Sequence, residues 1–171
     1  YMHGVESTED PQWQQKIERP YSTSPCLKKL PIFAVLGNHD YRGSKIAQFN
    51  YHKKNARWHM PHRFYRVNFG SLINLIAFDS NFTDYCFGLS KNCAGDFLFK
   101  QLEDKPKSWN LVMAHHPIKS ASQSGYSHRG GILGFFMRPL LCHKADAWLS
   151  GHAHHLEHRK IEGCRLQAFV A

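Results

Sequence analysis

Short apolar runs alternate along the chain with segments whose apolar residues recur at helical spacing. The runs are too short for buried helices, so they predict strands at 32–36, 72–78, 109–114, 147–149 and 166–170. The helical spacing predicts helices at 13–19, 44–57, 96–103 and 135–144, with Ser44 as the N-cap of the second. Strands that alternate with helices predict an α/β architecture, in which helices flank central sheets.

We expect one domain over residues 1–171, because no repeat, low-complexity tract or linker divides the sequence. The hydrophobic content of 42% is ample for one buried core. No apolar run is long enough to span a bilayer, and the first ten residues lack the basic start and apolar stretch of a signal peptide. Any targeting segment is therefore expected to be absent or already removed.

The formal net charge is +9, from 22 Lys and Arg against 13 Asp and Glu. A positive field favours anionic ligands, and nucleic acid and phosphate esters are both candidates. The basic residues are scattered instead of forming a block, as on an ordinary solvated surface. The 13 histidines are grouped, however, and grouped imidazoles suggest a metal.

Three predicted strands end in the same way, with an apolar run followed directly by residues that can bind a metal. The first leads into Asn38, His39 and Asp40, the second into His115 and His116, and the third into His152 and His154. Because the carboxyl ends of strands in α/β sheets line the ligand crevice, we expect the three segments to converge on one point.

The residue types fit a first-row divalent ion, for which imidazole nitrogens and an amide oxygen are suitable ligands. Each segment alone has an ordinary structural explanation: Asn38 and Asp40 favour turns anyway, and either ring of the His115–His116 pair can serve the core or face solvent. The three segments together, each after a buried strand, are far more specific than any one of them.

With these motifs the sequence resembles the calcineurin-like metallophosphoesterases, which carry GNH[DE], a histidine after a strand, and GHxH. Within that superfamily it is most similar to the small, tartrate-resistant type of purple acid phosphatase, over nearly the whole chain. The resemblance implies a four-layer α/β/β/α sandwich, here incomplete at both ends. The segment Tyr1-Met2-His3-Gly4-Val5 looks like the remainder of a family motif whose metal-binding carboxylates would lie upstream.

The same resemblance implies two metal ions, Fe³⁺ together with Fe²⁺, Zn²⁺ or Mn²⁺. Tyr1 and His154 would bind the ferric ion, and the phenolate of Tyr1 would give the family its colour. Asn38, His115 and His152 would bind the divalent ion.

For catalysis the resemblance implies that His39 contacts the phosphate and assists the leaving oxygen, with Asp40 orienting its ring. His128 matches a second histidine of the family's flexible loop, for which residues 120–131 are the candidate gating segment. Tyr41 stands where relatives have a histidine, and Ser124-Gly125-Tyr126 stands where their flexible loop carries a proton-donating histidine. These differences leave the protonation of the leaving group and the substrate preference open.

The implied reaction is hydrolysis of phosphate monoesters by a metal-activated hydroxide, at acidic pH, in a secreted, periplasmic or lysosomal protein. The implied substrates are phosphorylated small molecules or phosphoproteins. Two alternatives remain open: a phosphodiesterase or nuclease of the same superfamily, which the basic charge would suit, and a non-catalytic member used as a binding module. Among the five cysteines, Cys86 and Cys93 are near enough in sequence to form a disulfide, and the odd count leaves at least one thiol unpaired.

Overall fold

The computed structural model describes residues 3–81, 94–103, 108–121 and 127–171, apart from the side chains at 103 and 127–132. The chain forms two compact units, Tyr1–Arg63 and Phe64–Ala171. The prediction of one domain over residues 1–171 stays a prediction. No helix in the described part of the chain is long and apolar enough to cross a bilayer.

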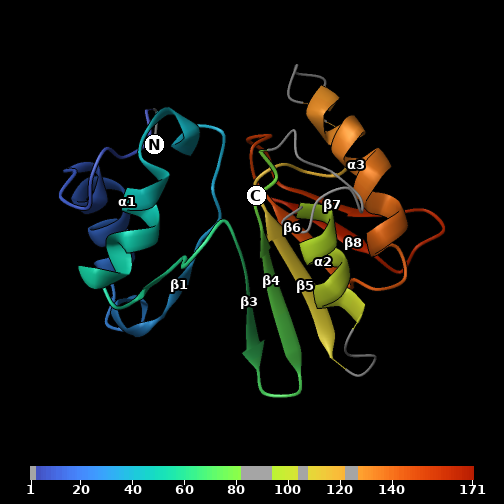
Figure 1. Ribbon diagram of the computed structural model, residues 1–171, viewed down its shortest axis with the longest axis horizontal. Coiled ribbons are helices and arrows are strands. Elements are labelled where there is room, and N and C mark those ends of the chain that lie inside the picture. Colours follow the sequence, from blue (N-terminus) through green and yellow to red (C-terminus); the bar gives the residue numbers. More distant parts are fainter. Residues whose placement is uncertain (1–2, 82–93, 104–107, 122–126) are drawn as a thin grey trace. The chain divides into compact units, whose positions relative to one another are not determined.

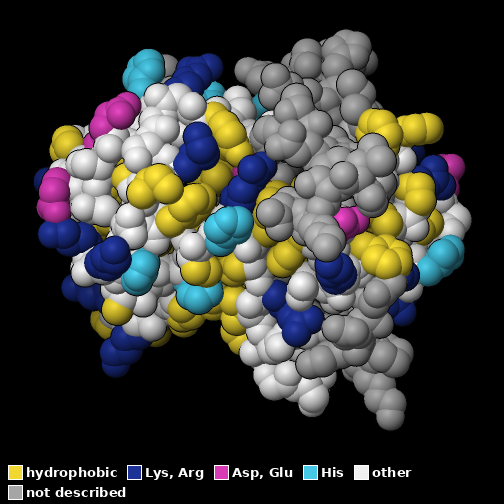
Figure 2. All heavy atoms as spheres, in the orientation of Figure 1, with side chains coloured by type: hydrophobic (Ala, Val, Ile, Leu, Met, Phe, Trp, Pro, Cys, Tyr) yellow, Lys and Arg dark blue, Asp and Glu magenta, His cyan; other side chains and the backbone are white. Residues whose placement is uncertain are grey.

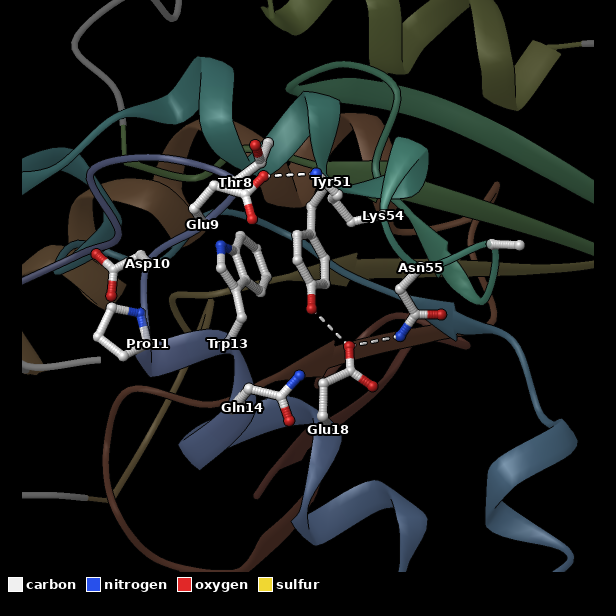
Figure 3. Close-up of a pocket in the computed structure, with 11 residues that line it drawn as sticks. Thr8, Glu9, Asp10, Pro11, Trp13, Gln14, Glu18, Tyr51, Lys54 and Asn55 are labelled. Carbon is white, nitrogen blue, oxygen red and sulfur yellow. Dashed lines mark hydrogen bonds and ion pairs between the residues drawn. The ribbon is translucent and has the colours of Figure 1, made fainter.

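The first unit contains few regular elements and is held together by an aromatic cluster. Trp13 stacks on Tyr51 with ring centroids 3.6 Å apart, and Trp58 meets the Trp13 ring edge-on at 5.1 Å. The carboxylate of Glu18 accepts hydrogen bonds from the Tyr51 hydroxyl at 2.6 Å and from the Asn55 amide at 2.7 Å (Figure 3). This network fixes the predicted 13–19 helix, observed as a π-helical turn at Gln14–Glu18, against the segment that contains Tyr51 and Asn55.

Strand β1 (Ile32–Phe33) pairs in parallel with β2 (Trp58–His59). The apolar run predicts a strand to residue 36, but the backbone loses its ladder pairing after Ala34. Helix α1 (Lys45–Asn50) starts as predicted, because the Ser44 side chain accepts a hydrogen bond from the Ala47 N–H at 3.1 Å. It ends earlier than predicted, and a 3₁₀ turn at Tyr51–Lys53 replaces its last turns.

The described residues of the second unit form a mixed six-stranded sheet with two helices on one face (Figure 1). Its strand order is β3-β4-β5-β6-β8-β7. The neighbouring pairs from β4 through β5 and β6 to β8 are parallel, whereas the outer pairs β3–β4 and β7–β8 are antiparallel. The strands are β3 (Phe64–Phe69), β4 (Ile73–Phe78), β5 (Trp109–Ala114), β6 (Ala147–Ser150), β7 (Glu157–Lys160) and β8 (Gln167–Val170).

Helices α2 (Ala94–Glu103) and α3 (Ser127–Leu141) cover the face of the sheet on which its core lies. Side chains such as Leu98 and Met137 from the helices pack against Ile76, Val112 and Trp148 from the central strands. These five side chains are fully buried. Such burial explains why the sequences of the parallel strands are largely apolar. The observed sheet and helices confirm the predicted α/β class.

A disulfide joins Cys142, just after α3, to Cys164, in the turn between β7 and β8. Sequence spacing did not single out this pair, because 22 residues separate the two cysteines. Cys26 is exposed and is the free thiol among the described cysteines. The predicted Cys86–Cys93 pair lies outside the described residues and stays a prediction.

We expect Cys142→Ser to lower the free energy of unfolding by about 3 kcal/mol, the value for releasing a loop of this length in the unfolded chain. Urea unfolding followed by tryptophan fluorescence would measure it under oxidising conditions. Cys26→Ser is the matched control and should change stability by less than about 0.5 kcal/mol, as for other surface substitutions. Equal stabilities for the two variants would contradict the structural role of the bridge.

Candidate metal centre

Three histidines meet at the carboxyl ends of β5 and β6. His115 and His116 directly follow β5, and His152 follows β6 by two residues. The two strands are parallel neighbours, so their outgoing segments lie side by side, and the Gly151 N–H donates to the His115 carbonyl at 3.0 Å. One ligand atom from each of the three rings lies within 4.8 Å of the others.

The closest pair is His115 Nε2 and His152 Nδ1, 3.0 Å apart. Two nitrogens bound to one cation at ~2.1 Å would be about 3.0 Å apart at a right angle and about 3.4 Å at the tetrahedral angle. Without a cation the same distance requires a proton between the rings, because two facing lone pairs repel. The donor set and its spacing therefore fit a divalent metal that replaces this proton.

His116 is a candidate from the sequence motif that the ligand set implied by the resemblance leaves out. The side chain of His116 is 1% exposed, and its ring centroid lies 4.4 Å from that of His152. Ser80, which follows β4 by two residues, contacts both the backbone and the ring of His116. The Ser80 hydroxyl accepts from the His116 backbone N–H at 2.9 Å and lies 3.0 Å from Nδ1. If Nδ1 carries the proton and donates it to Ser80, Nε2 offers a lone pair to a cation; the other tautomer offers none.

The backbone at the HxH motif is held in an uncommon conformation. His152 has φ +65° and His154 has φ +53°, in the left-handed region that non-glycine residues rarely adopt. The Ala153 N–H closes a three-residue turn onto the Gly151 carbonyl at 2.8 Å. Such conformations cost on the order of 1–3 kcal/mol each and concentrate at functional sites.

This turn also changes the expected direction of the two HxH rings. An extended segment would point them the same way, but here His152 is buried within the cluster while the His154 side chain is exposed and outside the group of three. The separation agrees with the idea that the two rings serve different ions. A role for His154 in a second metal site stays a prediction.

The Asn38-His39-Asp40 segment belongs to the first unit and forms a tight turn after β1. The Asp40 carboxylate accepts a hydrogen bond from the Gly37 N–H at 2.7 Å and another from the Gln48 side chain. Burial raises the pKa of Asp40, and the Gly37 N–H opposes that rise. Asp40 therefore fixes the shape of the turn that presents Asn38 and His39. Their participation in one centre with the histidines stays a prediction.

The start of the chain packs on the same turn. Gly4 has φ +72°, and a Cβ there would lie 2.7 Å from the Gly43 nitrogen, so a larger residue does not fit. The Ser44 N–H donates to the Val5 carbonyl at 2.7 Å. This contact is consistent with the expectation that the first residues supply a ligand beside this turn. Tyr1 itself and the side chain of His128 lie outside the described residues, and their roles stay predictions.

A pocket of about 460 Å³ in the first unit is unsuited to a phosphate ester (Figure 3). Three carboxylates line it, from Glu9, Asp10 and Glu18, against the ammonium of Lys54, which pairs with Glu9 at 2.6 Å. Its excess of negative charge would repel an anionic substrate. The histidine cluster is therefore the better candidate for phosphate chemistry.

Comparison with known proteins points to the same chemistry. The family model for calcineurin-like phosphoesterases matches residues 3–156. The chain is 28% identical to tartrate-resistant acid phosphatase type 5 of Homo sapiens, covering 95% of this chain and 54% of that protein. It is 32% identical to purple acid phosphatase 3 of Arabidopsis thaliana, covering 92% of this chain and 47% of that protein. The chain spans about half the length of the curated relatives it matches.

A solved structure described as GAP50, the anchor in the inner membrane complex of Plasmodium, superposes with a TM-score of 0.76. It is 24% identical, and the alignment covers 99% of this chain and 57% of that one. At this identity the likeness establishes the fold alone.

We expect His152→Ala to weaken binding of Zn²⁺ to the metal-free protein on the order of a hundredfold or more, because it removes a donor from the closest pair. Isothermal titration measures this directly. His158→Ala is the control, since His158 is an exposed histidine on β7 that stacks on Phe169. Equal affinity in the two variants would exclude the cluster as a metal site. His116→Ala in the same titration determines whether His116 is a third ligand.

Proposed function

Because the chain belongs to the calcineurin-like phosphoesterase family, we propose that its protein hydrolyses phosphate monoesters at a dinuclear metal centre under acidic conditions. The observation that carries the proposal is the 3.0 Å approach of His115 Nε2 to His152 Nδ1 at adjacent strand ends. Two further facts support it: the relatives are named acid phosphatases, and the GNHD and GHxH motifs are intact.

His115 and His152, with Asn38 as the family motif assigns it, would hold a divalent ion such as Fe²⁺, Zn²⁺ or Mn²⁺. Tyr1 and His154 would hold Fe³⁺. Two bound cations would neutralise the phosphate oxygens, hold the ester in line and lower the pKa of water. Imidazole and amide donors suit the divalent ion, and a phenolate suits the ferric one.

His39 takes the role of donating a proton to the leaving oxygen. Asp40 would orient the His39 ring, and both of its carboxylate oxygens accept hydrogen bonds that brace the turn, from the Gly37 N–H and the Gln48 side chain. General acids of this kind contribute on the order of a hundredfold or more to turnover. His128 is proposed as a second substrate contact.

The positive charge of the protein supports an anionic substrate, either a phosphorylated small molecule or a phosphoprotein. In Figure 2 the Lys and Arg side chains are spread over the visible face of each unit instead of gathering in one patch. A nuclease would use a basic surface to follow a nucleic-acid backbone. Hydrolysis rates on a monoester and on a diester, compared directly, distinguish the monoesterase from this alternative.

The disulfide between Cys142 and Cys164 supports an oxidising compartment, and we propose that the protein is secreted, periplasmic or vesicular. Such locations agree with a hydrolase that works at acidic pH.

A non-catalytic role is the second candidate, because the similar fold of GAP50 is described as that of an anchor in a membrane complex. The two candidates differ in what they require of the histidines. A binding module has no need for three imidazoles that share one small volume or for a strained turn at His152. These features favour the enzyme.

We expect the purified full-length protein to hydrolyse p-nitrophenyl phosphate faster than bis(p-nitrophenyl) phosphate, with its maximum at acidic pH. His39→Ala should lower turnover of the monoester by about a hundredfold while metal content stays unchanged. His52→Ala, an exposed histidine after α1, is the control. Faster hydrolysis of the diester would favour the phosphodiesterase, and no hydrolysis of either ester would favour the binding module.

We expect two metal ions per chain and a visible tyrosinate absorption band in the iron-loaded protein. Tyr1→Phe should remove the band, because it removes the phenolate oxygen, whereas Tyr21→Phe, at an exposed tyrosine, should leave it. Elemental analysis and an absorption spectrum measure both. A single metal per chain, or none, would overturn the dinuclear centre.

A further inference from the structure

The side-chain carboxylate of Glu157, the first residue of β7, accepts hydrogen bonds from several donors. Its side chain is only 10% exposed. The donors are the Ser120 hydroxyl at 3.1 Å, the Ala121 N–H at 3.1 Å, His155 Nε2 at 2.9 Å and Arg159 Nε at 2.7 Å. A largely buried carboxylate that accepts hydrogen bonds from four donors is a strong local anchor.

Three of the four donors come from two segments that also carry the histidines of the cluster, and the fourth, Arg159, lies on β7 itself. Ser120 and Ala121 lie on the segment that leaves β5 through His115 and His116. His155 lies on the segment that leaves β6 through His152. Glu157 therefore joins two segments that begin at neighbouring strand ends, beside the contact of the Ser120 hydroxyl with His155 Nε2 at 3.5 Å.

The same two segments are already joined at their beginnings, by the hydrogen bond from the Gly151 N–H to the His115 carbonyl at 3.0 Å. With Glu157 they form a closed frame, linked at both ends. The close pair of nitrogens from His115 and His152 lies between these two links along the chain. The left-handed backbone at His152 and His154 also lies within the frame, and a closed frame prevents it from relaxing to a more common conformation.

We propose that Glu157 is a positioning residue of the metal centre: it ties the segment carrying His115 to the segment carrying His152 and thereby keeps their donor nitrogens at the spacing a metal ion requires. The inference rests on the proposed function, since it presupposes that the cluster binds a metal. Glu157 acts through the backbone of both segments, and its role is distinct from that of a ligand.

The charge of Glu157 is maintained under the conditions that the proposed function implies. Burial raises the pKa of Glu157, but the hydrogen bonds from His155, Ala121 and Arg159 outweigh it and lower the pKa to about 2. The carboxylate thus remains ionised in mildly acidic solution, where its bonds to His155 and Arg159 are charge-assisted.

The test is the affinity of the metal-free, full-length protein for Zn²⁺, measured by isothermal titration. We expect Glu157→Gln to bind Zn²⁺ about tenfold or more weakly, the usual effect of losing a residue that orients ligands. Glu162→Gln makes the same chemical change at an exposed position in the β7–β8 turn and should leave the affinity unchanged. A double variant with Ser120→Ala should bind no more weakly than Glu157→Gln alone, because both act through one frame.

Two results with Glu157→Gln would overturn the inference. One is Zn²⁺ affinity within about twofold of wild type in Glu157→Gln while His152→Ala has lost binding. The other is a lower melting temperature for Glu157→Gln with no change in affinity, which would make Glu157 a residue of general stability. If Glu157→Gln fails to fold, Ser120→Ala alone must weaken Zn²⁺ binding, and an unchanged affinity overturns the inference. A wild-type protein that takes up no Zn²⁺ would instead refute the proposed metal centre itself.

Discussion

Parallel pairing of β5 with β6 is the constraint on which the rest of the site depends. Because the register places Met113 beside Leu149, both strands end at the same edge of the sheet, and the residues that follow must share a small volume. Ser80 reaches the same place from β4, which is parallel to β5. The buried core on the helix-covered face stabilises these three strands, and the histidines are thereby brought together before any ion binds.

Strands buried in the centre of the sheet were predictable from the sequence, whereas those at its edges were not. The prediction for β5 matches at both ends, because the residues from Leu111 to Ala114 form an apolar run of strand length. Strand β7 has the sequence EHRK and was missed, since an edge strand with half-exposed side chains carries no apolar signal. Strand β3 was missed as an element because Arg66 and Asn68 interrupt its apolar residues.

The site was predictable as far as its motifs reach. The motifs placed His115 and His152 at neighbouring strand ends, and the structure brings them to 3.0 Å. The approach of His116 depends on Ser80, 36 residues away, and no local pattern links the two. The contribution of Glu157 likewise arises from contacts 36 and 37 residues away in the chain. Long-range hydrogen bonds of this kind follow from the register of the sheet, which the sequence alone does not specify.

The left-handed turn at His152 has a consequence for the evolution and engineering of this protein. Glycine adopts this conformation without a steric penalty, so the backbone alone would favour His152→Gly, but that substitution removes the donor nitrogen. The backbone conformation and the metal-ligand role thus place opposite demands on the residue at position 152. An engineered variant of higher thermal stability would have to keep His152 and place its stabilising substitutions elsewhere in the sheet.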